Sequence, residues 1–202
     1  MEPAVALVRA YLQINGYFTV TDYPVVEAVR AGEHRATTDL DILAVRFPGV
    51  SRLIARRGKG VHADEEIVAT DPALACPAKR IDLLIGEVKE GRAAVNPGAR
   101  SPEVMRAALM RFGCCGSDDV ALAVTQLLRH GLAVLPAGHQ VRLVAFGSSG
   151  EESNPNYHTV FLRQVVGFLR EYLREHWSIM RHANTKDSAL GLLMTLEKAG
   201  TL

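Results

Sequence analysis

The chain has 202 residues, which is long enough for one domain with a sizeable core, and we expect a single domain over residues 1–202. Hydrophobic residues make up 48% of the chain and charged residues 22%, as in an ordinary soluble protein. The formal net charge of +1 predicts no strong overall attraction to polyanions, so any basic surface must be local.

The sequence predicts neither a membrane span nor a secretory signal. The longest apolar stretch, residues 120–135, is interrupted by Gln126, Arg129 and His130. The first residues lack a basic segment followed by an apolar one. The three cysteines, an odd total that includes the adjacent pair Cys114 and Cys115, favour a reducing compartment. We therefore expect a cytoplasmic protein.

The first half of the chain alternates between patterned and irregular segments. Residues 3–15 have the apolar spacing of an amphipathic helix. Residues 17–29 are rich in β-branched and aromatic side chains but contain Pro24, which indicates an edge strand or a bulged one. A connection over residues 30–37 leads to a strand over residues 39–47, followed by a long irregular excursion over residues 48–80.

The second half begins with a strongly apolar strand over residues 81–89. Further helices are predicted over 102–112, from 117 to just before Gly131, over 156–177 and over 187–198, with a strand over 140–146. This order predicts an α/β domain with a mixed sheet packed between helices. Its core is expected over about residues 3–147, with the helices of residues 156–199 packed on it.

Two opposite charges end the strand of residues 81–89. Because side chains alternate along a strand, Glu87 and Lys89 must project from one face and Val88 from the other. Charges on a buried strand are costly unless they are paired or bind a metal or a ligand. Asp39 and Asp41 share a face of the preceding strand. If Asp41 lies near Glu87, the two carboxylates, the Val88 carbonyl and water can hold a divalent cation such as Mg²⁺.

Asp41 followed by Glu87-Val88-Lys89 at the end of an apolar strand resembles the PD-(D/E)XK nuclease superfamily. The order of elements is similar to the common core of that superfamily over about residues 3–147. The resemblance implies a restriction-endonuclease-like α/β/α sandwich and a magnesium-dependent endonuclease, with Mn²⁺ as the other cation. Asp41 and Glu87 would hold the metal together with the Val88 carbonyl, and Lys89 would assist the metal-activated water that hydrolyses the phosphodiester bond.

Several other acidic residues compete for the metal. Asp39 has the same face as Asp41, and Glu27 on the preceding strand is an additional acid. Asp82 is the worse choice because five residues of strand place it roughly 16 Å from Glu87 and on the opposite face. An alternative interpretation of Asp39 and Asp41 is the paired-aspartate strand of nucleotidyltransferases. Those enzymes need a Gly-Ser loop shortly before the aspartates, whereas the similar Gly147-Ser148 pair lies far downstream of them in this chain.

A run of basic residues lies in the irregular excursion. Five of them and no acid occur across residues 46–59, which predicts a local positive surface for phosphate backbones: Arg46, Arg52, Arg56, Arg57 and Lys59. The predicted partner is nucleic acid, with DNA favoured over RNA, and a homodimer is compatible with the sequence. The alternative function is a non-cleaving nuclease-fold module that binds nucleic acid or a partner protein.

Overall fold

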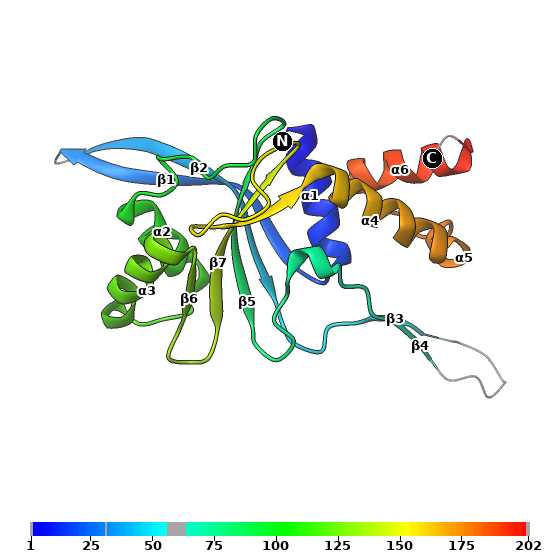
Figure 1. The fold of residues 1–202 in the computed structure, drawn as a ribbon, viewed down its shortest axis with the longest axis horizontal. Helices are drawn as coiled ribbons and strands as arrows, with labels where there is room; N and C mark the ends of the chain where they lie inside the picture. Colours follow the sequence, from blue (N-terminus) through cyan, green and yellow to red (C-terminus); the bar gives the residue numbers. More distant parts are fainter. Residues whose placement is uncertain (1, 31, 56–63, 201–202) are drawn as a thin grey trace.

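A computed structural model describes residues 2–30, 32–55 and 64–200. The described elements form a mixed α/β architecture in which a curled mixed sheet is flanked by helices (Figure 1). The first elements in chain order are α1 (Pro3–Ile14), β1 (Phe18–Arg30), β2 (Glu33–Arg46), β3 (Arg52–Ile54), β4 (Glu65–Ile67), the 3-10 helix η1 (Pro72–Leu74) and β5 (Asp82–Val88). They are followed by α2 (Pro102–Phe112), α3 (Ser117–His130), β6 (Leu132–Val134), β7 (Gln140–Gly147), β8 (His158–Phe161), α4 (Leu162–Glu175), α5 (Trp177–Met180) and α6 (Ser188–Lys198).

The central sheet has the strand order β1-β2-β5-β7-β6. β8 pairs with the same edge of β7 as β6 does, but nearer the carboxyl end of β7. The pairs β1·β2, β2·β5 and β6·β7 are antiparallel, whereas β5·β7 and β7·β8 are parallel. Parallel neighbours need a crossover, which α2 and α3 supply between β5 and β7. The carboxyl ends of β5, β7 and β8 therefore lie at the same edge of the sheet.

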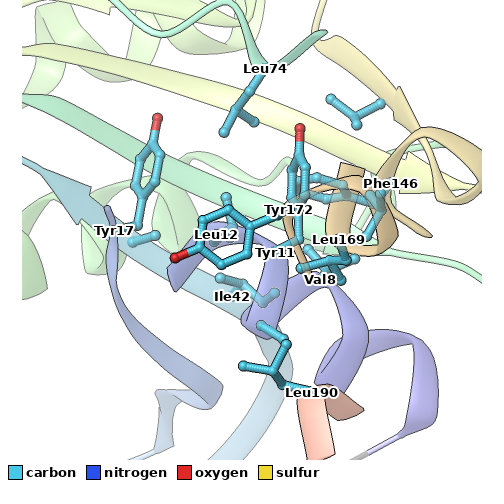
Figure 2. Packing of buried hydrophobic residues seen from close by; sticks show 14 of the residues in the cluster. Val8, Tyr11, Leu12, Tyr17, Ile42, Leu74, Phe146, Leu169, Tyr172 and Leu190 are labelled. Carbon is cyan, nitrogen blue, oxygen red and sulfur yellow. The ribbon is translucent and has the colours of Figure 1, made fainter. Parts of the chain in front are cut away.

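Two hydrophobic clusters cover the two faces of the sheet. On one face, α1 packs against β2 and β5, and α4 and α6 pack with α1 in the same cluster. The strands contribute Ile42, Leu84 and Phe146 to this cluster, and Figure 2 shows Ile42 and Phe146 among its side chains. On the other face, α2 and α3 pack on Leu43, Leu83 and other strand residues. Alternate residues of β2 and β5 thus enter different clusters, which explains the continuous apolar run in the sequence of β5. This arrangement confirms the predicted mixed sheet between helices.

The structure confirms most of the predicted elements and corrects three of them. The predicted connection over residues 30–37 is wrong, because β2 begins at Glu33 and pairs with the outer part of β1 as a long hairpin. The predicted helix over residues 156–177 begins only at Leu162, because residues 158–161 pair with the free edge of β7 as β8. The irregular excursion contains the short pair of strands β3 and β4.

Candidate active site

Asp41 and Glu87 occupy facing positions on two paired strands. In the antiparallel pair of β2 and β5, Ile42 lies opposite Gly86, so the next residues along the two strands are Asp41 and Glu87. The Asp41 carboxylate accepts a hydrogen bond of 2.7 Å from the backbone N–H of Val88. The residues between the two strands therefore leave the sheet and return, as the sequence-based prediction requires, and Asp41 lies at the end of β5.

Lys89 lies beside Glu87 as the strand alternation predicts. Its Nζ atom is 2.8 Å from Oε1 of Glu87, whose side chain is only 5% exposed, whereas that of Lys89 is 39% exposed. The backbone N–H of Lys89 donates to the carbonyl of Phe146 on β7, which holds this residue in line with β5. The ammonium is thus fixed at the edge of the sheet with one side open to solvent.

Close backbone packing also fixes the loop that follows Lys89. A Cβ atom added at Gly147, the last residue of β7, would lie 2.4 Å from the backbone nitrogen of Ala93. Only glycine therefore lets the loop lie against the end of β7. Three backbone hydrogen bonds join the segments: the N–H groups of Ser148 and Ser149 donate to the Gly91 carbonyl, and that of Ala93 donates to the Ser149 carbonyl.

The two carboxyl groups are held in an environment that disfavours their charged forms. Burial raises the pKa of Asp41 even though the Val88 N–H and Lys89 act in the opposite direction. Burial also raises the pKa of Glu87, and the negative charge of Asp41 adds to this shift while the bond to Lys89 opposes it. A group that neutralises both carboxylates, such as a cation, would remove this cost.

Lys89 remains an ammonium group at neutral pH. Burial acts to lower its pKa, but the hydrogen bond and charge of Glu87, together with the charges of Asp41 and Glu2, outweigh burial, and the net pKa is raised above its ordinary value. A protonated lysine cannot accept a proton from water. In this arrangement Lys89 is therefore suited to stabilising negative charge or orienting a water molecule.

Sequence reasoning missed two acidic residues near Asp41. The charges of Glu2 and Asp22 both act to raise the pKa of Asp41, and Glu2 also acts on Lys89. On β1, Asp22 lies across from Asp41 of β2, because its neighbours Thr21 and Tyr23 pair with the residues on either side of Asp41. Asp22 has a φ of 53°, a backbone angle that aspartate tolerates better than most residues do. Neither position carries a sequence signal, because their proximity depends on strand register and on where α1 begins.

The other acidic candidates lie away from Glu87. Asp39 is exposed and faces Pro24 across the hairpin, two residues further from β5. Glu27 faces Arg35 in the outer part of the same hairpin. Asp82 lies at the opposite end of β5, where its fully buried carboxylate bonds to Arg142 at 2.8 Å and to the Tyr17 hydroxyl. Asp82 is thus part of a buried ion pair in the core.

The basic run divides between the core and the far end of the sheet. Arg46 is buried, and its guanidinium donates to the carbonyl of Asn15 and to Thr70. Arg52 lies in β3, which follows the end of β2 remote from Asp41 (Figure 1). Its guanidinium contacts the sulfur of Met180. The structure does not bring Arg52 to Asp41, and Arg56, Arg57 and Lys59 lie outside the described residues.

The donor set fits a hard cation that keeps part of its water shell. Over residues 2–30, 32–55 and 64–200, no three or more histidine, cysteine or acidic side chains form a group that could hold a metal. The site therefore offers the two carboxylates of Asp41 and Glu87. The Val88 carbonyl lies on the Asp41 side of β5, because the N–H of the same strand residue points there. Mg²⁺ typically takes one or two carboxylates, and water and substrate oxygens complete its coordination.

As the pH is lowered, metal binding at this site is expected to weaken at a higher pH than it would at an ordinary pair of carboxylates. In the folded protein the pKa of Asp41 is raised above its ordinary value of 3.8, and that of Glu87 above 4.5. The protonated carboxyl groups therefore stabilise the fold, and this contribution is lost as the pH rises through their folded-state pKa values. A cation that binds the ionised pair therefore releases protons and stabilises the protein most at neutral pH. We expect Mn²⁺ to raise the melting temperature more at about pH 7.5 than at about pH 5.

The Asp41→Asn variant is the control for this titration, because asparagine can still accept the Val88 hydrogen bond but carries no charge. Its melting temperature should not respond to Mn²⁺ at either pH. A wild-type response that is equal at both pH values would contradict the assignment of the site to these carboxylates.

Comparison with known proteins adds no further assignment: no family model, no curated protein and no solved structure matches this chain. Among the described residues, no helix has both the length and the apolar character needed to cross a membrane. All three cysteines are free thiols.

Proposed function

We propose that the protein is a metal-dependent nuclease of restriction-endonuclease-like fold that hydrolyses phosphodiester bonds in nucleic acid, with DNA as the favoured substrate. The observation that carries the proposal is the meeting of Asp41, Glu87 and Lys89 at one end of a buried strand pair. A buried and a half-buried carboxylate with raised pKa values beside a partly exposed ammonium are typical of catalytic sites. The mixed sheet, with helices on both faces and a crossover between β5 and β7, supports the proposed fold.

Asp41 and Glu87 would hold Mg²⁺ or Mn²⁺. When bound, such a cation polarises the phosphate and lowers the pKa of water. The Val88 N–H keeps Asp41 oriented toward the end of β5, and the Phe146 carbonyl keeps Lys89 in place. The Lys89 ammonium, whose side chain is 39% exposed, would be accessible to a phosphate at this end of the sheet. Lys89 would then stabilise the negative charge that develops on the phosphate oxygens.

A specific observation also favours the alternative of a non-cleaving module that binds nucleic acid or a partner protein. Glu87 is satisfied by Lys89, and Asp41 by the Val88 N–H, so each carboxylate has a partner within the protein. A partly buried ion pair of this kind can persist as a structural feature. The two functions differ in one measurable property, because only the nuclease needs a divalent cation.

The proposal is tested by incubating the purified protein with single-stranded and double-stranded DNA and RNA, with Mg²⁺, with Mn²⁺ and with chelator. We expect cleavage of at least one substrate, with Mg²⁺ or Mn²⁺ and none with chelator. Binding without cleavage under all of these conditions would favour the non-cleaving module.

A further inference from the structure

One exposed arginine lies on the face of the sheet on which the proposed catalytic lysine projects. The β5 side chains of Leu83 and Ile85 belong to the cluster that α2 and α3 cover. Because side chains alternate along a strand, Glu87 and Lys89 project on this face as well. Figure 1 shows α2 and α3 on this side of the sheet and α1, α4 and α6 on the other. Arg111, in the last turn of α2, is exposed on the same side.

Arg111 is held beside the hairpin that carries Asp41. Its guanidinium carbon lies 5.7 Å from the centre of the Tyr23 ring. Tyr23 pairs with Leu40, the residue next to Asp41, and both Tyr23 and Leu40 pack on the cluster that α2 and α3 cover. The strand order β1-β2-β5 therefore places Arg111 on one side of Asp41 and Lys89 on the other.

The contact with Tyr23 leaves the hydrogen-bonding edge of Arg111 free. A guanidinium that lies over a ring uses its flat face, whereas its N–H donors point outward in the plane of the group. Within the part of the chain that the structure describes, no hydrogen bond and no ion pair engages these donors. Arg100, by contrast, donates to the Leu128 carbonyl. Arg111 therefore presents a charged donor group to solvent while a ring holds it in place.

A phosphate is the group that this arrangement fits. Arginine binds phosphate through two parallel N–H donors, and its guanidinium keeps its charge at every physiological pH. Successive phosphates of one nucleic acid strand are about 3.4 Å apart along the helix axis, and adjacent protein strands are about 4.8 Å apart. A nucleic acid strand with a phosphate at Asp41 and Glu87 would therefore bring a neighbouring phosphate within reach of Arg111. Tyr23 reduces the side-chain freedom that Arg111 would lose on binding.

We propose that Arg111 binds a backbone phosphate that neighbours the cleaved bond on the substrate strand, and that Tyr23 positions Arg111 for this contact. This inference rests on the proposed nuclease function and assigns it a substrate-binding residue. Because phosphates carry no sequence information, the contact would fix the position of the strand and would not select a sequence. It also supplies a local cation beside the carboxylates in a chain whose net charge is only +1.

Substitutions at Arg111 and Tyr23 test the inference through the salt dependence of binding. Arg111→Gln removes the charge, whereas Arg111→Lys keeps it without the planar fork. Tyr23→Leu keeps the charge of Arg111 and removes the ring beneath it. The matched control is Arg106→Gln, because Arg106 is an exposed arginine of the same helix that points to another side of it. Each substitution is combined with Glu87→Gln, which removes a metal ligand and keeps the strand uncut.

Binding of fluorescent single-stranded and double-stranded oligodeoxynucleotides is measured in Mg²⁺ at several KCl concentrations. We expect Arg111→Gln to weaken binding about tenfold at low salt and to lower the slope of log K against log salt concentration by about 0.7 to 0.9, as for one lost phosphate contact. Arg111→Lys should keep the slope, and Tyr23→Leu should weaken binding without changing the slope. Arg106→Gln should bind as Glu87→Gln alone does. Equal affinity and slope for Arg111→Gln and Arg106→Gln would overturn the inference.

Cleavage assays with an intact Glu87 separate this inference from the nuclease proposal. If the wild type cuts nucleic acid and Arg111→Gln has the same kcat/KM, the Arg111 inference fails and the nuclease proposal stands. If the wild type cuts nothing but Arg111→Gln still lowers the salt slope of binding, the phosphate contact stands and the nuclease proposal fails. A lower melting temperature of Arg111→Gln with unchanged binding would show that Arg111 only stabilises the end of α2, which also overturns the inference.

Discussion

Replacing either carboxylate of the proposed metal site is expected to reduce Mg²⁺-dependent cleavage by at least about a hundredfold, because a lost ligand removes several kcal/mol of charge stabilisation. Asp41→Asn and Glu87→Gln keep the size of each side chain and remove its charge. Lys89→Ala should have an effect of similar size, since it removes the ammonium that is bonded to Glu87. Cleavage rates under saturating Mg²⁺, compared at equal concentrations of folded protein, measure these effects.

Two control variants make this comparison specific. Asp39→Asn changes the neighbouring carboxylate of β2, which is exposed and faces Pro24, and it should retain nearly full activity. Arg92→Ala removes a cation three residues after Lys89 that pairs with Glu151 at the surface, and it should also remain active. If Asp39→Asn were as inactive as Asp41→Asn, the assignment of the metal ligand would be wrong.

Loss of the buried guanidinium of Arg142 is expected to destabilise the fold by about 3–5 kcal/mol, because it leaves the carboxylate of Asp82 buried without its ionic partner. Arg142 donates to Asp82, to the Tyr17 hydroxyl and to the carbonyl of Leu74, so it joins β5 and β7 to the segment around η1. Although burial alone would lower the pKa of Arg142, the charge of Asp82, the influence of Tyr17 and the hydrogen bonds to both together outweigh burial and raise this pKa. The guanidinium therefore stays charged.

Urea unfolding of Arg142→Met measures this loss, which corresponds to a fall of about 10 °C in melting temperature for a domain of this size. The double variant Asp82→Asn/Arg142→Met should recover part of the stability, because it contains no unpaired buried charge. Arg92→Ala is the matched surface control and should cost less than about 1 kcal/mol, since the side chains of Arg92 and of its partner Glu151 are both more than 60% exposed. An equal effect of the two single arginine variants would contradict the proposed role of Arg142.

The part of the site that follows from strand geometry could be predicted from the sequence. The alternation of side chains places Glu87 and Lys89 on one face, and the apolar run of β5 indicates a strand covered on both sides. Parity and distance along the strand also separate Asp82 from Glu87. These arguments are local and need no knowledge of which strands are neighbours.

The parts that depend on register and on distant contacts could not be predicted. Asp22 comes close to Asp41 only through the pairing of β1 with β2, and Glu2 only through the position of α1. Residues 158–161 carry the apolar spacing of the helix that follows, yet they form a strand because the edge of β7 beyond β6 is free to pair. The position of Arg52 relative to Asp41 could not be predicted, since the sequence does not tell from which end of the sheet the irregular segment of residues 48–80 departs.

The most direct test of the proposed metal centre is a crystal structure of the protein with Mn²⁺, in which anomalous scattering locates the ion. We predict one ion about 2.0 to 2.3 Å from a carboxylate oxygen of both Asp41 and Glu87, with the Lys89 ammonium displaced from Glu87. An ion bound elsewhere, or none at saturating Mn²⁺ while Lys89 keeps its bond to Glu87, would contradict the metal-dependent nuclease proposed here.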